Sequence, residues 1–104
     1  MNLYSGLSER AAENRPVRVV LVGAGKFASM FLAQARRIPA LHLLGVADLK
    51  VNRALEALPR TGWPRDRLTH ESINVALRSG KTFVTDEAQE MIRGNGVDVV
   101  IEAT

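Results

Sequence analysis

A short aliphatic run followed by a glycine-containing turn restricts the fold of this chain more than any other feature. The run Val17 to Val22 is almost purely β-branched and aliphatic, interrupted only by Arg18. Such a composition is typical of a strand that is buried on both faces, as in a parallel sheet. After Gly25 the apolar residues recur every three or four positions, which is the spacing of a helix. The sequence therefore predicts a strand, a tight turn and a helix in direct succession.

Strands and helices continue to alternate along the rest of the chain. The apolar patterns predict four strands, and proline, glycine and capping residues mark the helix ends between them. Asp86 and Gln89 have the spacing of a capping box at the start of the last helix. This alternation predicts an α/β fold with parallel strands joined by right-handed crossovers. The predicted strands are 17–22, 41–48, 82–85 and 97–103, and the predicted helices are 25–37, 51–58, 71–79 and 87–93.

The turn after the first strand has the pattern G-x-G-x-x-A, formed by Gly23, Gly25 and Ala28. Gly23 lets the backbone turn sharply, Gly25 lets a pyrophosphate approach the main chain, and Ala28 lets the helix pack close to the sheet. The helix N-terminus then faces the phosphates. Asp48 ends the second strand 20 positions after Ala28, where an acid accepts hydrogen bonds from the adenosine ribose. This combination predicts a Rossmann-type dinucleotide site, with an ordinary strand–turn–helix corner as the alternative.

Four more residues near the turn are candidates for cofactor contacts. Lys26 is placed to touch a phosphate or to be solvated, and Phe27 is expected to pack in the core rather than cover the cofactor. Asp48 favours NAD because it repels a 2′-phosphate, whereas Lys50 and Arg53 either pair with that phosphate in NADP or are solvated bases. We therefore expect either NAD or NADP to bind. On this view, Asp48→Ala weakens NAD and Arg53→Ala weakens NADP.

Other nucleotide and metal sites do not fit the sequence. A P-loop containing Gly25 and Lys26 would need glycine where Val20 stands, and serine or threonine where Phe27 stands. His42 and His70 have no metal-ligand spacing between them, and the chain has no cysteine. We therefore expect no metal site, and both histidines to be structural or on the surface.

Composition and charge exclude several further classes of protein. The net charge is +3, the bases are scattered and the aromatic content is 5%, so a nucleic-acid partner is not expected. No apolar run approaches the roughly 18 residues of a membrane span, and the N-terminus lacks the pattern of a signal peptide. We therefore expect a cytoplasmic protein without a membrane contact.

The chain resembles the NAD(P)-binding domain of homoserine-dehydrogenase-like oxidoreductases. The segments that carry the resemblance are "VRVVLVGAGKFASMFLAQARRIPALHLLGVADL", "RTGWP", "TFVTDEA" and "VDVVIEAT". They are most similar to the bacterial group with a C-terminal SAF domain, which includes proteins like 1-deoxy-D-xylulose 5-phosphate reductoisomerase. The resemblance implies hydride transfer between a nicotinamide cofactor and a small carbonyl or hydroxyl substrate. It also implies a cofactor contact near Thr104, at the end of the fourth strand. The chain departs from the family pattern at Ala28, where glycine is usual.

The expected organisation is an N-terminal helical arm, residues 1–15, followed by a partial Rossmann domain, residues 16–104. Its sheet is expected to have the order 3-2-1-4 and to be truncated after the fourth strand. Catalytic groups and a substrate pocket are expected beyond residue 104, so this chain alone is expected to have no catalytic residues and no turnover. The apolar edge of strand 97–103 predicts a homo-oligomer. The alternative function is a regulatory nucleotide-binding module without catalysis.

Overall fold

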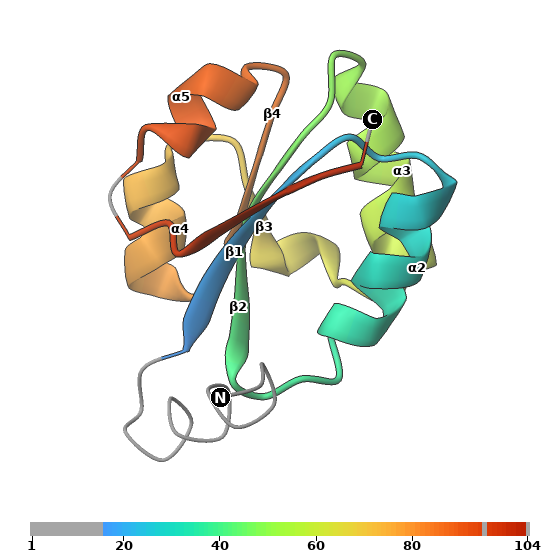
Figure 1. Ribbon diagram of the computed structural model, residues 1–104, viewed down its shortest axis with the longest axis horizontal. Helices are drawn as coiled ribbons and strands as arrows, with labels where there is room; N and C mark the ends of the chain where they lie inside the picture. Colours follow the sequence, from blue (N-terminus) through green and yellow to red (C-terminus); the bar gives the residue numbers. More distant parts are fainter. Residues whose placement is uncertain (1–15, 95, 104) are drawn as a thin grey trace.

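Five parallel strands form one sheet with two helices on each face (Figure 1). The computed structural model describes residues 16–94 and 96–103, so the predicted N-terminal arm lies outside the described residues. The strands are β1 (Val17–Val22), β2 (Leu41–Ala47), β3 (Leu68–Thr69), β4 (Thr82–Thr85) and β5 (Val99–Glu102). The helices are α2 (Lys26–Ala35), α3 (Val51–Arg60), α4 (Ile73–Ser79) and α5 (Ala88–Ile92), with a 3-10 turn at Arg65–Arg67.

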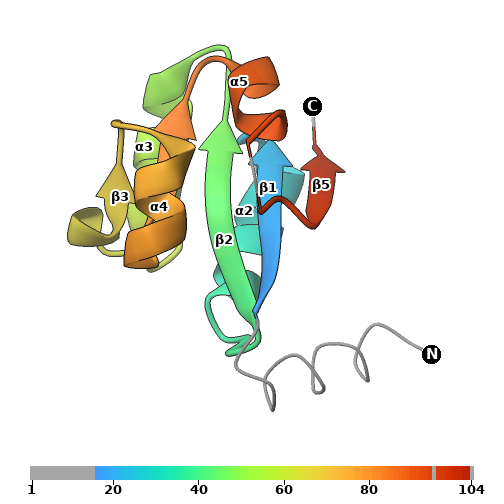
Figure 2. The same ribbon diagram turned by 90° about the vertical axis from the view of Figure 1, so that its left-hand side faces the viewer.

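The sheet has the order β3-β4-β2-β1-β5, so the predicted four-stranded order 3-2-1-4 is wrong (Figure 2). The difference is the additional strand β3, which pairs with β4 at one edge through the partners Leu68↔Thr82 and Thr69↔Phe83. Two residues are too short a segment to produce a period-2 pattern, so the sequence predicts a loop in this part of the chain. The predicted α/β class with an all-parallel sheet is confirmed.

Two apolar layers hold the helices to the sheet. Helices α2 and α3 cover one face and α4 and α5 the other (Figure 1). All five residues from Leu43 to Ala47 are buried, as expected for a parallel strand with helices on both sides. The first layer is built from Leu21, Ala28, Leu32, Leu43, Val46, Ala54, Ala57, Leu58 and Val84. The second contains Val20, Leu44, Ala47, Ile73, Ala76, Phe83 and Met91.

The helix ends differ from the predictions where capping contacts override the sequence signals. Helix α3 continues through Pro59 to Arg60, and the Thr61 hydroxyl donates to the Ala57 carbonyl (2.7 Å) at its end. The predicted capping box of α5 is wrong: the N-cap is Glu87, and it makes no side-chain capping bond. Instead the Thr85 hydroxyl accepts from the Glu87 N–H (3.1 Å), which leads the chain from β4 into the helix.

Helix α4 ends where the sequence predicts. The Ser72 hydroxyl caps its start by accepting from the Val75 N–H (3.1 Å), and Gly80 ends it in the left-handed conformation.

Across the described residues, 16–94 and 96–103, no helix is both long and apolar enough to cross a membrane.

Candidate functional site

The glycine turn lies where β1 ends and α2 begins. Gly23 has a φ of +102°, a conformation that residues with a side chain rarely adopt. Its N–H donates to the Ala47 carbonyl (2.7 Å), which joins the turn to the end of the neighbouring strand β2. Gly25 follows as the N-cap of α2 in an extended conformation. The first helical hydrogen bond runs from the Ser29 N–H to the Gly25 carbonyl (3.0 Å).

The N-terminus of α2 has the features of an anion-binding end. No side chain caps it, and its first turn contains no acidic residue. Helix geometry leaves the N–H groups of the first turn without acceptors inside the helix, and the helix dipole adds partial positive charge there. Ala28 is fully buried against the sheet, so the helix start packs close to β1, as predicted. An anion placed at this turn meets free donors and a favourable dipole.

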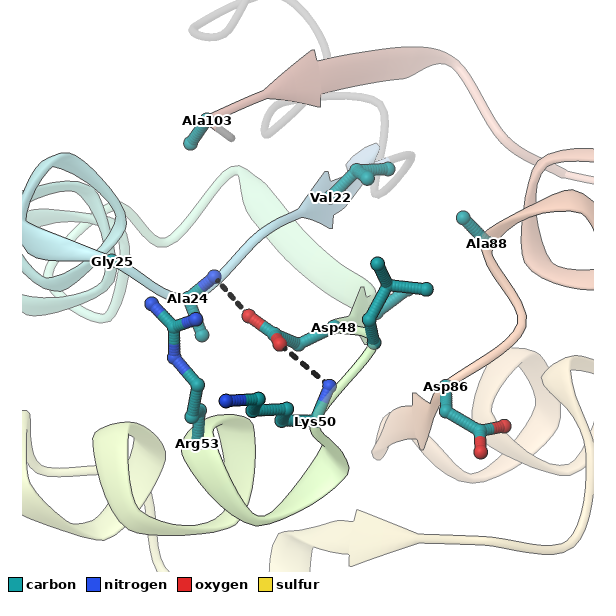
Figure 3. A pocket seen from close by; sticks show the side chains of 11 residues that line it. Val22, Ala24, Gly25, Asp48, Lys50, Arg53, Asp86, Ala88 and Ala103 are labelled. Atoms are coloured by element: carbon teal, nitrogen blue, oxygen red, sulfur yellow. Dashed lines mark hydrogen bonds between the residues drawn. The ribbon is translucent and has the colours of Figure 1, made fainter.

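Asp48 connects the loops that follow two neighbouring strands. One carboxylate oxygen, Oδ2, accepts from the Ala24 N–H (2.9 Å), and the other, Oδ1, accepts from the Lys50 N–H (2.8 Å) (Figure 3). The Asp48 N–H donates to the Thr85 carbonyl at the end of β4 (3.1 Å). The side chain is only 9% exposed. Asp48 therefore holds the glycine turn against the start of α3, and each carboxylate oxygen keeps a further lone pair for a ligand.

A cleft of about 570 Å³ opens between these loops at the carboxyl edge of the sheet. This is the edge at which open α/β sheets bind their ligands, and the volume is within the roughly 300–1,000 Å³ of small-molecule sites. The loops after β1, β2, β4 and β5 all contribute to its wall (Figure 3). The lining residues are Val22, Ala24, Gly25, Ala47, Asp48, Leu49, Lys50, Arg53, Asp86, Ala88 and Ala103.

Two cations lie on the α3 side of the cleft. The Arg53 side chain extends from α3 toward the turn at Ala24 and Gly25 (Figure 3). A methyl group placed on Gly25 would lie 3.9 Å from Nη2 of Arg53, and no other group that it could contact lies within 4 Å. The Lys50 side chain is exposed beside it, whereas the Asp86 carboxylate points away from Asp48 (Figure 3). The space in front of Gly25 is thus open and bordered by positive charge.

The structure brings together four of the residues predicted from the sequence, because Gly25, Asp48, Lys50 and Arg53 all line the cleft. Gly23 and Ala28 shape the turn without lining it, and the exposed Lys26 lies on the first turn of α2. Thr104 lies outside the described residues. Ala103, next to it, lines the cleft at the strand end where the resemblance implies a cofactor contact. Asp86 and Ala88 were not predicted from the sequence, and only the sheet order brings them to the cleft.

The expectation that Phe27 packs in the core is wrong, because its side chain is 61% exposed. The buried face of α2 is formed by Ala28, Leu32 and Ala35. Phe27 precedes Ala28 by one position and is therefore rotated by about 100° away from that face. Its exposed ring stands on the first turn of the helix, beside the glycine turn.

The two histidines are bound to main-chain carbonyls. His42 Nε2 lies 2.8 Å from the Lys81 carbonyl oxygen, and His70 Nδ1 lies 3.3 Å from that of Val84. Burial lowers the pKa of His42, the Lys81 carbonyl partly opposes this, and the charges of Arg18 and Arg67 lower the pKa further. Within the described part of the chain, no group of three or more histidine, aspartate and glutamate side chains is placed to hold a metal ion.

Comparisons with known proteins do not assign the chain to a family. No family model matches it, and a search of curated proteins finds no match.

Proposed function

We propose that the cleft binds NAD or NADP. One arrangement carries the proposal: an uncapped helix N-terminus after a glycine turn faces the same cleft as an acid at the end of the next strand. Pyrophosphate and ribose have to be recognised at these two places in a dinucleotide site of this type. The carboxyl edge of the sheet is also the place where α/β folds of this kind bind ligands.

The residues present fit the cofactor. Gly25 leaves open space where the pyrophosphate would approach, and a side chain at this position would fill that space. The N–H groups of the first turn of α2 would donate to the phosphate oxygens. Asp48 would accept from the adenosine ribose with the lone pairs that its two main-chain contacts leave available. Arg53 and Lys50 would then face either the pyrophosphate or a 2′-phosphate.

The activity we propose is that of an oxidoreductase that transfers a hydride to or from a small carbonyl or hydroxyl substrate. When bound, a nicotinamide cofactor supplies the hydride chemistry. The residues of the cleft bind and orient that cofactor. The resemblance to homoserine-dehydrogenase-like and deoxyxylulose-phosphate reductoisomerase-like proteins supports this assignment, because their motifs coincide with the glycine turn and Asp48.

Arg53→Gln is expected to weaken NADP binding about tenfold more than NAD binding. A guanidinium group binds the oxygens of a phosphate group in a paired geometry, and a hydrogen bond to a charged group contributes about 1.5–3 kcal/mol. NAD lacks the 2′-phosphate, so the substitution lowers its affinity less. Isothermal titration calorimetry of the chain with each dinucleotide measures the difference.

Arg93→Gln is the matched control, because it removes the same charge from an exposed residue at the end of α5 that does not line the cleft. It should leave both affinities unchanged. Equal weakening of NAD and NADP by Arg53→Gln would instead place this side chain at the pyrophosphate. No effect on either cofactor would remove Arg53 from the proposed site.

A further inference from the structure

A second pocket, of about 440 Å³, lies at the opposite edge of the sheet, where the strands begin. We call it the amino-edge pocket and define its polar wall by Arg18, Arg36, His42 and Arg67. Ile38, Trp63 and Leu77 contribute apolar surface. It shares no lining residue with the dinucleotide cleft, which is bordered by the loops that follow the strands. The two could therefore be occupied at the same time.

Three arginines line this pocket, and its described lining residues include no aspartate or glutamate. Arg18 and His42 are register partners on the adjacent strands β1 and β2, so their side chains leave the same face of the sheet side by side. The charges of Arg18 and Arg67 both reach the His42 ring, since both contribute to the lowering of its pKa. Arg18 and Arg67 thus concentrate positive charge around His42 in a concave surface, where the field of such a cluster is focused.

The Arg18 side chain has an unsatisfied donor. Its Nε is buried and has no hydrogen-bond partner among the residues that the structure describes. A buried donor without an acceptor is uncommon in proteins, and a bound ion or water often supplies the acceptor in such cases. The Asp98 carboxylate does not line the pocket; its Oδ2 accepts from the Arg18 main-chain N–H at the strand edge (2.9 Å).

Two contacts hold two of the lining residues, Trp63 and Arg36, in position. The Trp63 indole N–H donates to the Leu32 carbonyl (3.0 Å), which fixes the ring at the end of α3. The Arg36 side chain packs on Gly62, which has a φ of +100°, and a methyl group at Gly62 would overlap the guanidinium. Cations held in place before a ligand arrives lose less conformational entropy on binding.

We propose that the amino-edge pocket binds a small phosphate ester. A phosphate dianion offers several acceptor oxygens and two charges to a wall with three guanidinium groups, and guanidinium groups bind phosphate in a paired geometry. The apolar side chains leave room for the organic part of the ester, and the volume is in the range of small-molecule sites. This pocket and its ligand do not depend on the dinucleotide assignment.

Residue-resolved NMR on the full chain tests this site with two probes, glycerol 3-phosphate and inorganic phosphate. We expect saturable shifts at the amides of Arg18, His42 and Thr82 and at the His42 ring. Arg18→Gln and Arg67→Gln should each weaken binding about tenfold, since each removes a charged hydrogen-bond donor. Arg93→Gln removes the same charge outside the pocket and should leave binding unchanged.

The relative affinities of glycerol 3-phosphate, inorganic phosphate and acetate show which chemical group the pocket recognises. Tighter binding of glycerol 3-phosphate supports an ester, and equal binding of the two probes supports recognition of the phosphate group alone. Acetate binding with the same affinity would overturn the choice of phosphate. Shifts that do not saturate, or that persist unchanged in the variants, would overturn the site. Because Arg67 is exposed, its variant keeps the test decisive if Arg18→Gln does not fold. Shifts confined to the glycine turn would report on the other cleft and count against this pocket.

Discussion

Asp48→Ala is expected to lower the free energy of unfolding by about 2–6 kcal/mol, because two main-chain N–H groups lose their acceptor and each such loss costs about 1–3 kcal/mol. These are the N–H groups of Ala24 and Lys50, and the carboxylate that binds them is almost buried. Chemical denaturation of the two proteins measures the difference. Asp86→Ala is the matched control: this acid borders the same cleft but is exposed, and a change within about 0.5 kcal/mol is expected.

The same substitution changes the expected effect on cofactor choice. From the sequence alone, Asp48→Ala should weaken NAD binding and spare or improve NADP binding. The contact with Ala24 means that alanine also removes a support of the glycine turn, so we now expect NADP to weaken as well. Unchanged stability in Asp48→Ala would contradict the structural role of the carboxylate. An undiminished NADP affinity would show that the turn keeps its shape without it.

Gly25→Val is expected to weaken both dinucleotides while leaving the fold intact. Its φ of −81° and ψ of −161° are open to any residue, and an added Cβ comes near only the flexible end of the Arg53 side chain. The stability change should stay within about 1 kcal/mol, the scale of an unfavourable N-cap. The valine side chain would occupy the approach of the pyrophosphate. Overpacking of this kind costs about 1–3 kcal/mol, or roughly a five- to 150-fold rise in Kd.

Calorimetric titration and thermal melting together measure this pair of effects. Ala33→Val is the control, because it adds two methyl groups to an exposed position of the same helix, outside the cleft. It should leave both affinities unchanged. If Gly25→Val bound NAD and NADP as tightly as the original chain, the pyrophosphate could not lie at this turn.

The sequence predicts the elements of this fold well where the apolar pattern is long. β1 and β2 are continuous aliphatic runs, and the glycine turn and Asp48 are recognisable because their spacing is local. Strand β3 is not predictable in this way, because two residues are too few to show an alternating apolar pattern. They form a strand only because they pair with β4. The start of α5 depends on a contact of Thr85 rather than on the Asp86 capping pattern.

The candidate site is predictable in its residues but less so in its contacts. The position of Asp48 follows from the end of an aliphatic strand, whereas its two main-chain hydrogen bonds depend on how neighbouring loops fold together. The exposed position of Phe27 depends on the rotation of α2 over the sheet. The amino-edge pocket has no sequence signature, because Arg18, His42 and Arg67 are far apart in the chain and meet only through strand pairing and loop packing.

Titration of the full chain with NAD and then with NADP, followed by amide NMR shifts, tests whether the cleft binds a dinucleotide. If the cleft binds a dinucleotide, saturable shifts are expected at the glycine turn, residues 23–28, and at Asp48 and Lys50. Gly25→Val is expected largely to remove these shifts. If neither cofactor shifts these amides, or if Gly25→Val leaves the shifts unchanged, the assignment of this cleft to a dinucleotide is contradicted.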